Sequence, residues 1–207
     1  MRILIFGATG ATGRYLVSQG LEQGCQITAF ARDPSSLTTN HPDLTIIKGD
    51  LSDRSSIANA LNGVDAIISV LGNDTRKALF KPSNIISHSL PNIISAMQQG
   101  GVERLVFVTS FGVSANMFWL EKLLLKTLLG NLFADLPLQE TLIKGSGLNW
   151  TIVRPARLTN GPKTGGCRSG DLYIHPFTSI SRVDVAAFLL KEVVSSEYQQ
   201  KAVTISY

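Results

Sequence analysis

The feature that most constrains this chain is a glycine-rich turn that follows its first apolar run. Residues Arg2 to Phe6 read as a buried strand, GATGATG (Gly7 to Gly13) follows at once, and a helical pattern comes next. The spacing G-x-x-G-x-x-G is one residue wider than the dinucleotide fingerprint, but the glycines keep the same physical roles. Gly7 would end the strand in a tight turn, Gly10 would let the backbone approach a pyrophosphate, and Gly13 would let the helix pack closely on the strand.

The turn predicts a phosphate site because the free N–H groups and the positive end of a helix would face the ligand. The two threonines of the turn would add hydroxyl donors. The expected contacts are Gly7, Thr9, Gly10, Ala11, Thr12 and Gly13. The alternative is a glycine-rich turn without a ligand, which the order of strand, turn and helix disfavours.

The rest of the chain alternates short apolar runs with longer helical patterns. The apolar runs predict strands at Arg2–Phe6, Gln26–Ala31, Leu44–Lys48, Ala66–Val70, Arg104–Thr109, Trp150–Arg154 and Ala202–Ile205. The predicted helices are Arg14–Gln23, Ser55–Leu61, Pro82–Gln99, Leu120–Lys144 with breaks at Gly130 and Pro137, and one from about Ser181, where Ser181 and Asp184 resemble a capping box. Continuously apolar strands suit a parallel sheet buried on both faces. We therefore predict a Rossmann-type α/β fold with a doubly wound, mainly parallel sheet, in a single domain over residues 1–207.

Composition narrows the class of partner. With 44% hydrophobic and 16% charged residues, the chain can build a sizeable core. Its net charge of +4 comes from scattered Lys and Arg, which indicates no nucleic-acid partner. The apolar stretch Met117 to Leu136 is interrupted by charges, which favours an amphipathic helix or a lid over a membrane span. Cys25 and Cys167 fit no paired or metal-ligand spacing, so we expect no metal and a reducing, cytoplasmic location. We further expect a monomer that acts on a small molecule.

The end of the second strand should select the dinucleotide. Arg32 and Asp33 stand where an acid favours the ribose of NAD and an arginine favours the 2′-phosphate of NADP. The planar guanidinium of Arg32 suits a phosphate, with help from Arg14, whereas Asp33 should cap the turn that follows it. These residues predict NADP(H) in preference to NAD(H). The alternative for Arg32 is an ordinary solvated charge.

Two further strand ends should contact the adenosine. Asp50 is expected to hydrogen-bond the adenine amino group, with Leu51 beneath the ring, although a turn or N-cap aspartate explains Asp50 equally well. Leu71 and Gly72 should run beside the ribose, where the missing side chain of Gly72 permits close approach.

Together these segments resemble a known family. GATGATGR, the ARD after the second strand, GDL, VLG, VTS, SGLNWTIVRPA and ISRVDVA are similar to segments of atypical short-chain dehydrogenase/reductases. Within these, the chain is most similar to the biliverdin IXβ reductases, also called NADPH flavin reductases. The resemblance implies an NADPH-dependent reductase that delivers hydride to a conjugated acceptor, either a flavin or a linear tetrapyrrole.

The resemblance implies few catalytic groups. The chain's tyrosines are Tyr15, Tyr173, Tyr198 and Tyr207. None has a lysine four residues later, so the Tyr-x-x-x-Lys pair of the wider superfamily is absent. A conjugated acceptor delocalises the arriving electrons and has less need of an enzymic acid. Ser110, in VTS, matches the family's active-site serine beside the nicotinamide, and Pro155 with Ala156 should position the ring. The alternative for Ser110 is a strand-end serine satisfied by backbone.

Two positions depart from the resembled family. Where its members carry histidines, this chain has Arg157, just after the proline, and Glu140 on the preceding helix. A histidine can shuttle a proton, but an arginine stays charged. Arg157 is therefore expected to act in catalysis by orienting an anion or stabilising negative charge.

The acceptor pocket should lie beyond the carboxyl ends of the strands. Its expected walls are Phe111, Gly112, Trp119 and the Thr159–Asp171 loop, and its expected anion-binding residues are Arg157, Lys163 and Arg168. The alternative for the two aromatic residues is plain core packing. The competing function is a non-catalytic NADP(H)-binding sensor or assembly factor that controls a partner protein, which the missing catalytic groups favour.

Overall fold

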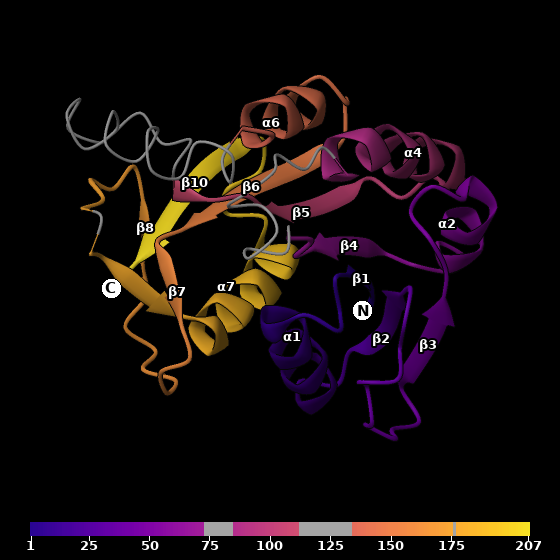
Figure 1. Ribbon diagram of the computed structural model, residues 1–207, viewed down its shortest axis with the longest axis horizontal. Coiled ribbons are helices and arrows are strands. Elements are labelled where there is room, and N and C mark those ends of the chain that lie inside the picture. Colours follow the sequence, from indigo (N-terminus) through magenta and orange to yellow (C-terminus); the bar gives the residue numbers. More distant parts are fainter. Residues whose placement is uncertain (73–84, 112–133, 176) are drawn as a thin grey trace.

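The computed structural model describes residues 1–72, 85–111, 134–175 and 177–207. Its central element is an eight-stranded sheet in the order β3-β2-β1-β4-β5-β6-β10-β8 (Figure 1). The strands are β1 (Arg2–Phe6), β2 (Gln26–Ala31), β3 (Leu44–Lys48), β4 (Ala66–Ser69), β5 (Arg104–Val108), β6 (Asn149–Pro155), β8 (Arg168–Gly170) and β10 (Lys201–Ser206). Only β8 pairs antiparallel among the described strands of this sheet. The predicted doubly wound, mainly parallel fold is therefore confirmed.

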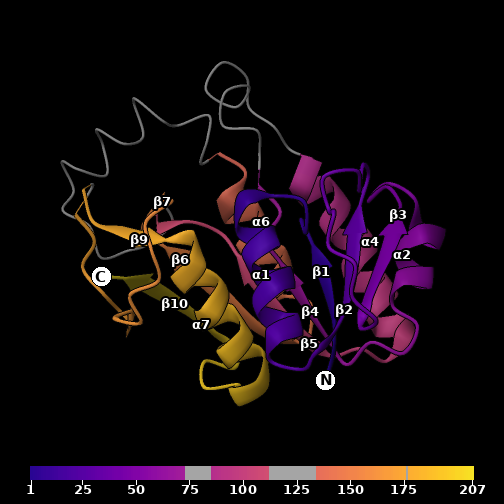
Figure 2. The ribbon, with the colours of Figure 1, turned by 90° about the horizontal axis from the view of Figure 1, so that it is seen from below.

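Helices cover both faces of the sheet (Figures 1 and 2). On one face lie α1 (Ala11–Glu22) and α7 (Arg182–Ser195), and on the other lie α2 (Arg54–Ala60), α4 (Ile85–Gly100) and α6 (Leu136–Lys144). Neighbouring residues of a strand face opposite layers: Ile5 packs with the α1 and α7 core, whereas Phe6 packs with the core under α2 and α4. This burial on both faces explains why the strands are continuously apolar.

The shared strand direction brings several chain segments to one edge of the sheet. Phe6 pairs with Ser69, Ser69 with Phe107, and Phe107 with Ile152, so β1, β4, β5 and β6 end side by side. The residues that follow these four strands include the glycine turn, Leu71, Ser110 and the segment after Pro155. The predicted cofactor residues therefore gather at the carboxyl edge.

A second, two-stranded parallel sheet was not predicted. It consists of β7 (Arg157–Thr159) and β9 (Ser179–Ser181). Its strands are three residues long and partly polar, so no periodic pattern marks them. The Thr159–Asp171 segment, predicted as a loop, also contains β8, which pairs with β10.

One helix prediction needs correction. Helix α1 begins at Ala11 rather than Arg14, because Gly13 lies inside the first turn instead of before it. The predicted boundary near Pro137 agrees with the start of α6 at Leu136: Pro137 stands in its first turn, where its missing N–H has no helical partner to lose. The predicted break at Gly130 lies outside the described residues. The predicted start at Ser181 is confirmed, since its side chain accepts a hydrogen bond from the N–H of Asp184.

Among the described helices, none is long and apolar enough to cross a membrane. The apolar stretch predicted as a lid or covering helix lies, as far as residue 133, outside the described residues.

Candidate cofactor and acceptor site

The glycine turn closes tightly on the sheet at two of its three glycines. Gly7 has a φ of +85°, and a Cβ there would lie 2.8 Å from the carbonyl oxygen of Val70. A Cβ at Gly13 would lie 2.1 Å from the carbonyl oxygen of Gly7. The protein's own backbone therefore requires both glycines. Gly10 differs, because it is exposed and the nearest atom to a Cβ there would be the Gly7 carbonyl oxygen, at 3.2 Å.

Helix α1 presents an open, positive end beside Gly10. Gly10 is the N-cap, and within the described chain no side chain caps the helix and no acidic residue lies in its first turn. The first N–H groups, at Ala11, Thr12 and Gly13, have no helical carbonyl partner. A pyrophosphate fits this end, because the helix dipole favours its charge and the small Gly10 leaves room for its approach.

At the adenosine end, two aspartates hold their own turns. Asp33 accepts a hydrogen bond from the N–H of Ser35 at 3.0 Å, so its predicted capping role is confirmed. Oδ1 of Asp50 accepts from the N–H and the hydroxyl of Ser52 at 2.8 and 2.7 Å. The turn alternative therefore describes this oxygen, and the adenine contact remains a prediction. The bonds from Ser52, with a smaller contribution from the charge of Arg32, lower the pKa of Asp50.

The two arginines predicted to read the 2′-phosphate are placed differently. Arg32 is exposed directly after β2, on the side of Asp50. Arg14 instead donates from Nε to the carbonyl oxygen of Thr9 at 3.1 Å, which ties it to the glycine turn. Leu51 and Leu71 are half-buried against the core, and Gly72 is exposed with no atom within 4 Å of a Cβ built there. Arg32 and Arg14 are both exposed, so the predicted roles of the two arginines at the 2′-phosphate remain predictions.

The predicted nicotinamide end is formed by the ends of β5 and β6. Ser110 follows β5, is half-buried, and its hydroxyl makes no hydrogen bond with a described residue. The alternative of a backbone-satisfied serine is therefore not what the structure shows. Pro155 is buried at the end of β6. The backbone N–H of Thr109 donates to the carbonyl oxygen of Val153 at 2.9 Å, which holds the two ends side by side.

A buried charge cluster lies directly behind these two strand ends. Glu140 is 2% exposed and accepts from Arg154 Nε at 2.8 Å, Arg154 Nη2 at 2.5 Å, Lys144 Nζ at 3.0 Å and the Thr109 hydroxyl at 3.1 Å. Burial opposes ionisation, but the hydrogen bonds from Arg154 and Lys144 prevail and lower the pKa of Glu140. We call Thr109, Glu140, Lys144 and Arg154 the carboxyl-end cluster. Sequence reasoning missed it, although a lone arginine in the apolar strand WTIVRP signals a buried partner.

The predicted acceptor residues divide into several groups. The guanidinium of Arg157 is exposed at the start of β7 and makes no hydrogen bond or ion pair with a described residue. Phe111 is 7% exposed in the core under α1 and α7, so the core-packing alternative describes it. Arg168 donates to the carbonyl oxygen of Tyr207, and Lys163 is exposed. Gly112 and Trp119 lie outside the described residues.

The segment after β7 is fastened to the first turn of α7. Asp184 accepts from the N–H groups of Thr164 and Gly165, from the hydroxyl of Ser181, and from Tyr207 at 2.6 Å. Burial opposes ionisation here too, but the bonds from Tyr207 and Thr164 prevail and lower the pKa of Asp184. The predicted Thr159–Asp171 loop is therefore anchored at Thr164 and Gly165.

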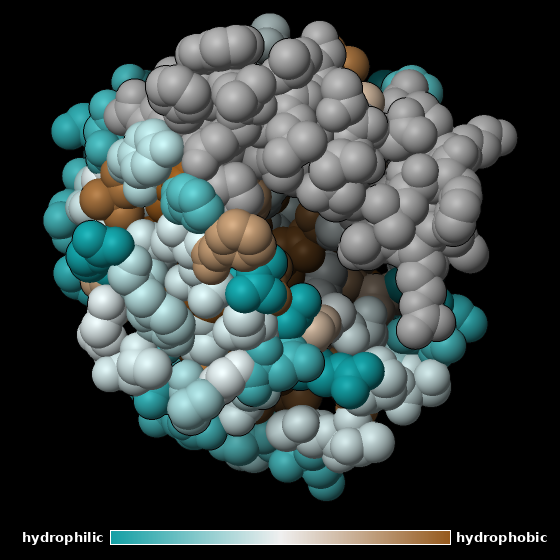
Figure 3. All heavy atoms as spheres, turned by 60° about the vertical axis from the view of Figure 1, so that its left-hand side comes forward, coloured by the Kyte–Doolittle hydropathy of each residue, from teal (hydrophilic) through white to brown (hydrophobic). Residues whose placement is uncertain are grey.

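Exposed aromatic residues beside β9 were also missed. Phe177 is 80% exposed and Tyr173 is 58% exposed. The ring of Phe177 lies beside that of His175, with centroids 5.3 Å apart and an angle of 33° between the ring planes. The N–H of Arg157 donates to the carbonyl oxygen of Thr178, so Phe177 is one residue from the backbone partner of Arg157. Figure 3, which brings the left-hand side of Figure 1 forward, shows a hollow with hydrophobic side chains at its base.

No metal centre is assembled in the part of the chain that the structure describes. There, no group of three or more His, Cys, Asp or Glu side chains could hold a metal ion. The described cysteines Cys25 and Cys167 are both free.

The fold and the open helix end define a dinucleotide-binding protein of the Rossmann class. A family model described as NAD(P)H-binding matches residues 7–195. The chain belongs to this NAD(P)H-binding family, and its cofactor is of the NAD(P)H class.

Two curated relatives cover almost the whole chain. An uncharacterized chloroplastic protein of Arabidopsis thaliana is 28% identical over 99% of this chain and 76% of its own length. A (4-alkanoyl-5-oxo-2,5-dihydrofuran-3-yl)methyl phosphate reductase of Streptomyces griseus is 25% identical over 99% of this chain and 67% of its own length. By contrast, this chain spans 32% of a 33% identical 3-beta-hydroxysteroid dehydrogenase of Mycolicibacterium neoaurum.

Two solved structures share the fold over nearly their full length. A wide-type short-chain dehydrogenase/reductase of Veillonella parvula in complex with NADP superposes with a TM-score of 0.82 at 18% identity, covering 100% of this chain and 94% of that one. ChuY, an anaerobillin reductase of Escherichia coli O157:H7, gives 0.79 at 22% identity, covering 99% and 96%. At these identities the likeness establishes the fold.

Proposed function

We propose that the protein is an NADPH-dependent reductase that transfers hydride to a conjugated acceptor, a linear tetrapyrrole of the biliverdin type or a flavin. The observation that carries the proposal is the scarcity of acids among the described residues at the ends of β5 and β6. Ser110 brings a hydroxyl there, whereas the nearby carboxylate of Glu140 is ionised and bound to Arg154. When bound, the dinucleotide would supply the hydride.

The tyrosines support an acceptor that needs no strong protein acid. The Tyr207 hydroxyl donates to Asp184, and the Tyr198 hydroxyl lies 2.9 Å from the hydroxyl oxygen of Ser169. Tyr15 is on helix α1, and no tyrosine of this chain has a lysine four residues later. A flavin or a tetrapyrrole spreads the arriving electron pair over a conjugated system, so solvent can supply the proton.

The remaining residues have positioning and binding roles in this proposal. Ser110 would donate a hydrogen bond to the acceptor or order a water, and Pro155 would hold the nicotinamide ring. Arg157, whose guanidinium is exposed and unpaired within the described residues, would bind a propionate or a flavin phosphate. The exposed ring of Phe177, near the start of β7, supports the binding of a planar acceptor there.

NADPH is the proposed dinucleotide, in preference to NADH. Arg32 is exposed at the end of β2, and a guanidinium there suits a 2′-phosphate. Location in the cytoplasm and a monomeric state remain predictions from the sequence.

The test is to mix the protein with NADPH and either FMN or a biliverdin isomer. The loss of NADPH absorbance measures the oxidation. We expect acceptor-dependent turnover, with deuterium at the transferred position of NADPH slowing a single turnover. Ser110→Ala should slow turnover by about tenfold. Arg157→Ala should raise the acceptor KM more than it lowers kcat, because the arginine is proposed to bind an anionic group of the acceptor in the ground state as well as in the transition state.

Two results would contradict the proposal. Tight NADPH binding without oxidation by any flavin or tetrapyrrole would favour the sensor or assembly factor instead. Complete loss of turnover in Ser110→Ala, with NADPH affinity unchanged, would make Ser110 the essential proton donor.

A further inference from the structure

We propose that Glu140 is a positioning residue of the hydride-transfer site, which sets where Ser110 and Pro155 lie by holding the ends of β5 and β6. The inference rests on the proposed function at one point, the placement of Ser110 and Pro155 beside the nicotinamide. It assigns no proton transfer to Glu140.

The first step of the argument is that Glu140 has no free hydrogen-bonding capacity for a ligand. Its Oε1 accepts from Arg154 Nε and from the Thr109 hydroxyl, and its Oε2 accepts from Arg154 Nη2 and Lys144 Nζ. The side chain is 2% exposed. With four donors on two oxygens, Glu140 is a fixed anchor on α6 and can act on the site only through its partners.

The second step is the place of those partners in the chain. Thr109 directly precedes Ser110, and Arg154 directly precedes Pro155. Consecutive Cα atoms are joined by a rigid peptide unit, so a shift of either partner moves the site residue after it. β5 ends at Val108, and beyond that point the backbone bond to Val153 and the hydroxyl bond to Glu140 hold Thr109. One carboxylate thus sets the spacing of two strand ends relative to α6.

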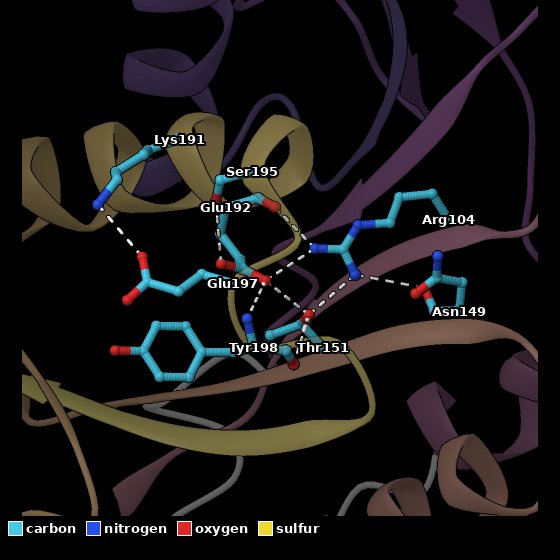
Figure 4. Close-up of polar contacts among 8 residues, drawn as sticks. All are labelled: Arg104, Asn149, Thr151, Lys191, Glu192, Ser195, Glu197 and Tyr198. Atoms are coloured by element: carbon cyan, nitrogen blue, oxygen red, sulfur yellow. Dashed lines mark hydrogen bonds and ion pairs between the residues drawn. The ribbon is translucent and has the colours of Figure 1, made fainter.

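The third step is that the same strands carry a matched cluster at their other ends. Arg104 begins β5, and its Nη2 lies 2.9 Å from Glu192 Oε1 of α7 (Figure 4). The Thr151 hydroxyl of β6 donates to the same carboxylate oxygen at 2.9 Å. We call Arg104, Thr151 and Glu192 the amino-end cluster. It has the same chemistry, a buried carboxylate that binds an arginine and a threonine, but it lies at the edge opposite the site.

The experiment therefore compares variants of two buried threonines, each of which bonds to a glutamate. The Thr151 hydroxyl also accepts from Arg104 Nη1 at 2.8 Å and lies 3.0 Å from the carbonyl oxygen of Tyr198. Thr109 and Thr151 are 8% and 0% exposed, and each hydroxyl donates to the glutamate of its cluster. Thr109→Val and Thr151→Val keep the shape of the side chain and remove that donor. Each variant is measured for its thermal midpoint, NADPH affinity, kcat, KM and the fluorescence lifetime of bound NADPH, which reports the surroundings of the nicotinamide.

For Thr109→Val we expect kcat to fall by about fivefold to tenfold and the NADPH affinity to change by less than about twofold. The fluorescence lifetime of bound NADPH should change as well. For Thr151→Val we expect a similar or larger drop in the thermal midpoint, with unchanged lifetime and a kcat per folded molecule within about twofold of the wild type. Glu140→Gln should show the Thr109→Val pattern more strongly.

Two outcomes overturn the inference: unchanged kcat and lifetime in a folded Thr109→Val, or equal changes in Thr109→Val and Thr151→Val. If Glu140→Gln does not fold, the threonine pair still decides. If the wild type reduces no acceptor, the proposed function fails, but the lifetime of bound NADPH still tests whether Glu140 positions the site.

Discussion

Strands β5 and β6 carry a buried charge cluster at each end, and the two clusters differ in the helix that they join and in their position relative to the candidate site. The amino-end cluster joins Arg104 to Glu192 of α7, with side chains 8% and 2% exposed. The carboxyl-end cluster joins Arg154 to Glu140 of α6, with side chains 15% and 2% exposed. The first lies on the α1 and α7 face, the second on the face covered by α2, α4 and α6. One borders the candidate site and the other does not.

The comparison shows that burial and pairing of charge do not by themselves indicate function. Both glutamates accept from an arginine and a threonine, and both arginines stand at a strand end. In a parallel α/β sheet, ligands bind beyond the carboxyl ends of the strands. Position therefore distinguishes the cluster far from the candidate site from the cluster that borders it. The amino-end cluster is the internal control for the other.

The largest expected effect is on stability, at the amino-end cluster. Glu192→Ala leaves the Arg104 charge buried without its carboxylate. It also removes the acceptor of the Tyr198 N–H and one of the two acceptors of the Thr151 hydroxyl. We expect a loss of about 3–5 kcal/mol in the free energy of unfolding, measured by urea denaturation. The activity of each folded molecule should stay unchanged.

A double variant provides the control for this loss. Arg104→Met with Glu192→Leu removes both charges and fills the space with apolar atoms, so it should recover most of the lost stability. A reduced kcat in the folded fraction of Glu192→Ala would break the comparison, because the amino end would then be coupled to the site.

The next effect concerns an exposed cation at the carboxyl edge. Arg32→Ala should weaken NADPH binding by roughly 1.5–3 kcal/mol for each charge-assisted hydrogen bond lost, and it should weaken NADH binding far less. The free energy of unfolding should change by less than about 0.5 kcal/mol, since Arg32 is a surface residue. Titration of NADPH and NADH by fluorescence measures the difference.

Lys48→Ala is the matched control, because Lys48 ends the adjacent strand β3 and is also an exposed cation. It should affect both dinucleotides by a similar, small amount. Equal losses of NADPH affinity in the two variants would mean that general positive charge, and not Arg32 itself, attracts the 2′-phosphate.

The sequence predicts the strand framework well because its signal is local. Arg2–Phe6, Gln26–Ala31 and Leu44–Lys48 are found with the predicted bounds. The first two are mostly buried, which suits their apolar residues, whereas the third is an edge strand with no buried residue and is marked by its β-branched residues. The short strands β7 and β9 were not predicted, because their pairing depends on contacts across about twenty residues of intervening chain and not on a pattern within three residues.

The candidate site was predictable where it is made of backbone and less so where it is made of side-chain pairs. The spacing of the glycines predicts the geometry of the turn, and the structure places Gly7 and Gly13 in tight contacts. From the sequence, Glu140 is recognisable only as a position where members of the resembled family carry a histidine. Its ion pair with Arg154 joins a helix to a strand, and such a contact leaves no periodic mark in the sequence.

The smallest expected effect is the pH dependence that Glu140 gives to stability. Its hydrogen bonds from Arg154 and Lys144, working against burial, lower its pKa in the folded state below the ordinary value of 4.5. The folded state then binds fewer protons than the unfolded state, so this contribution is fully present above about pH 4.5 and is lost as the pH falls through the folded-state pKa. The stability difference between wild type and Glu140→Gln should therefore shrink on acidification. Urea unfolding from about pH 7 to about pH 3 measures it. Ile143→Val, a fully buried neighbour on α6 that carries no charge, should cost about 0.5–1.5 kcal/mol at every pH. If the Glu140→Gln difference is equally constant with pH, the carboxyl-end cluster stabilises the fold by packing and not by charge.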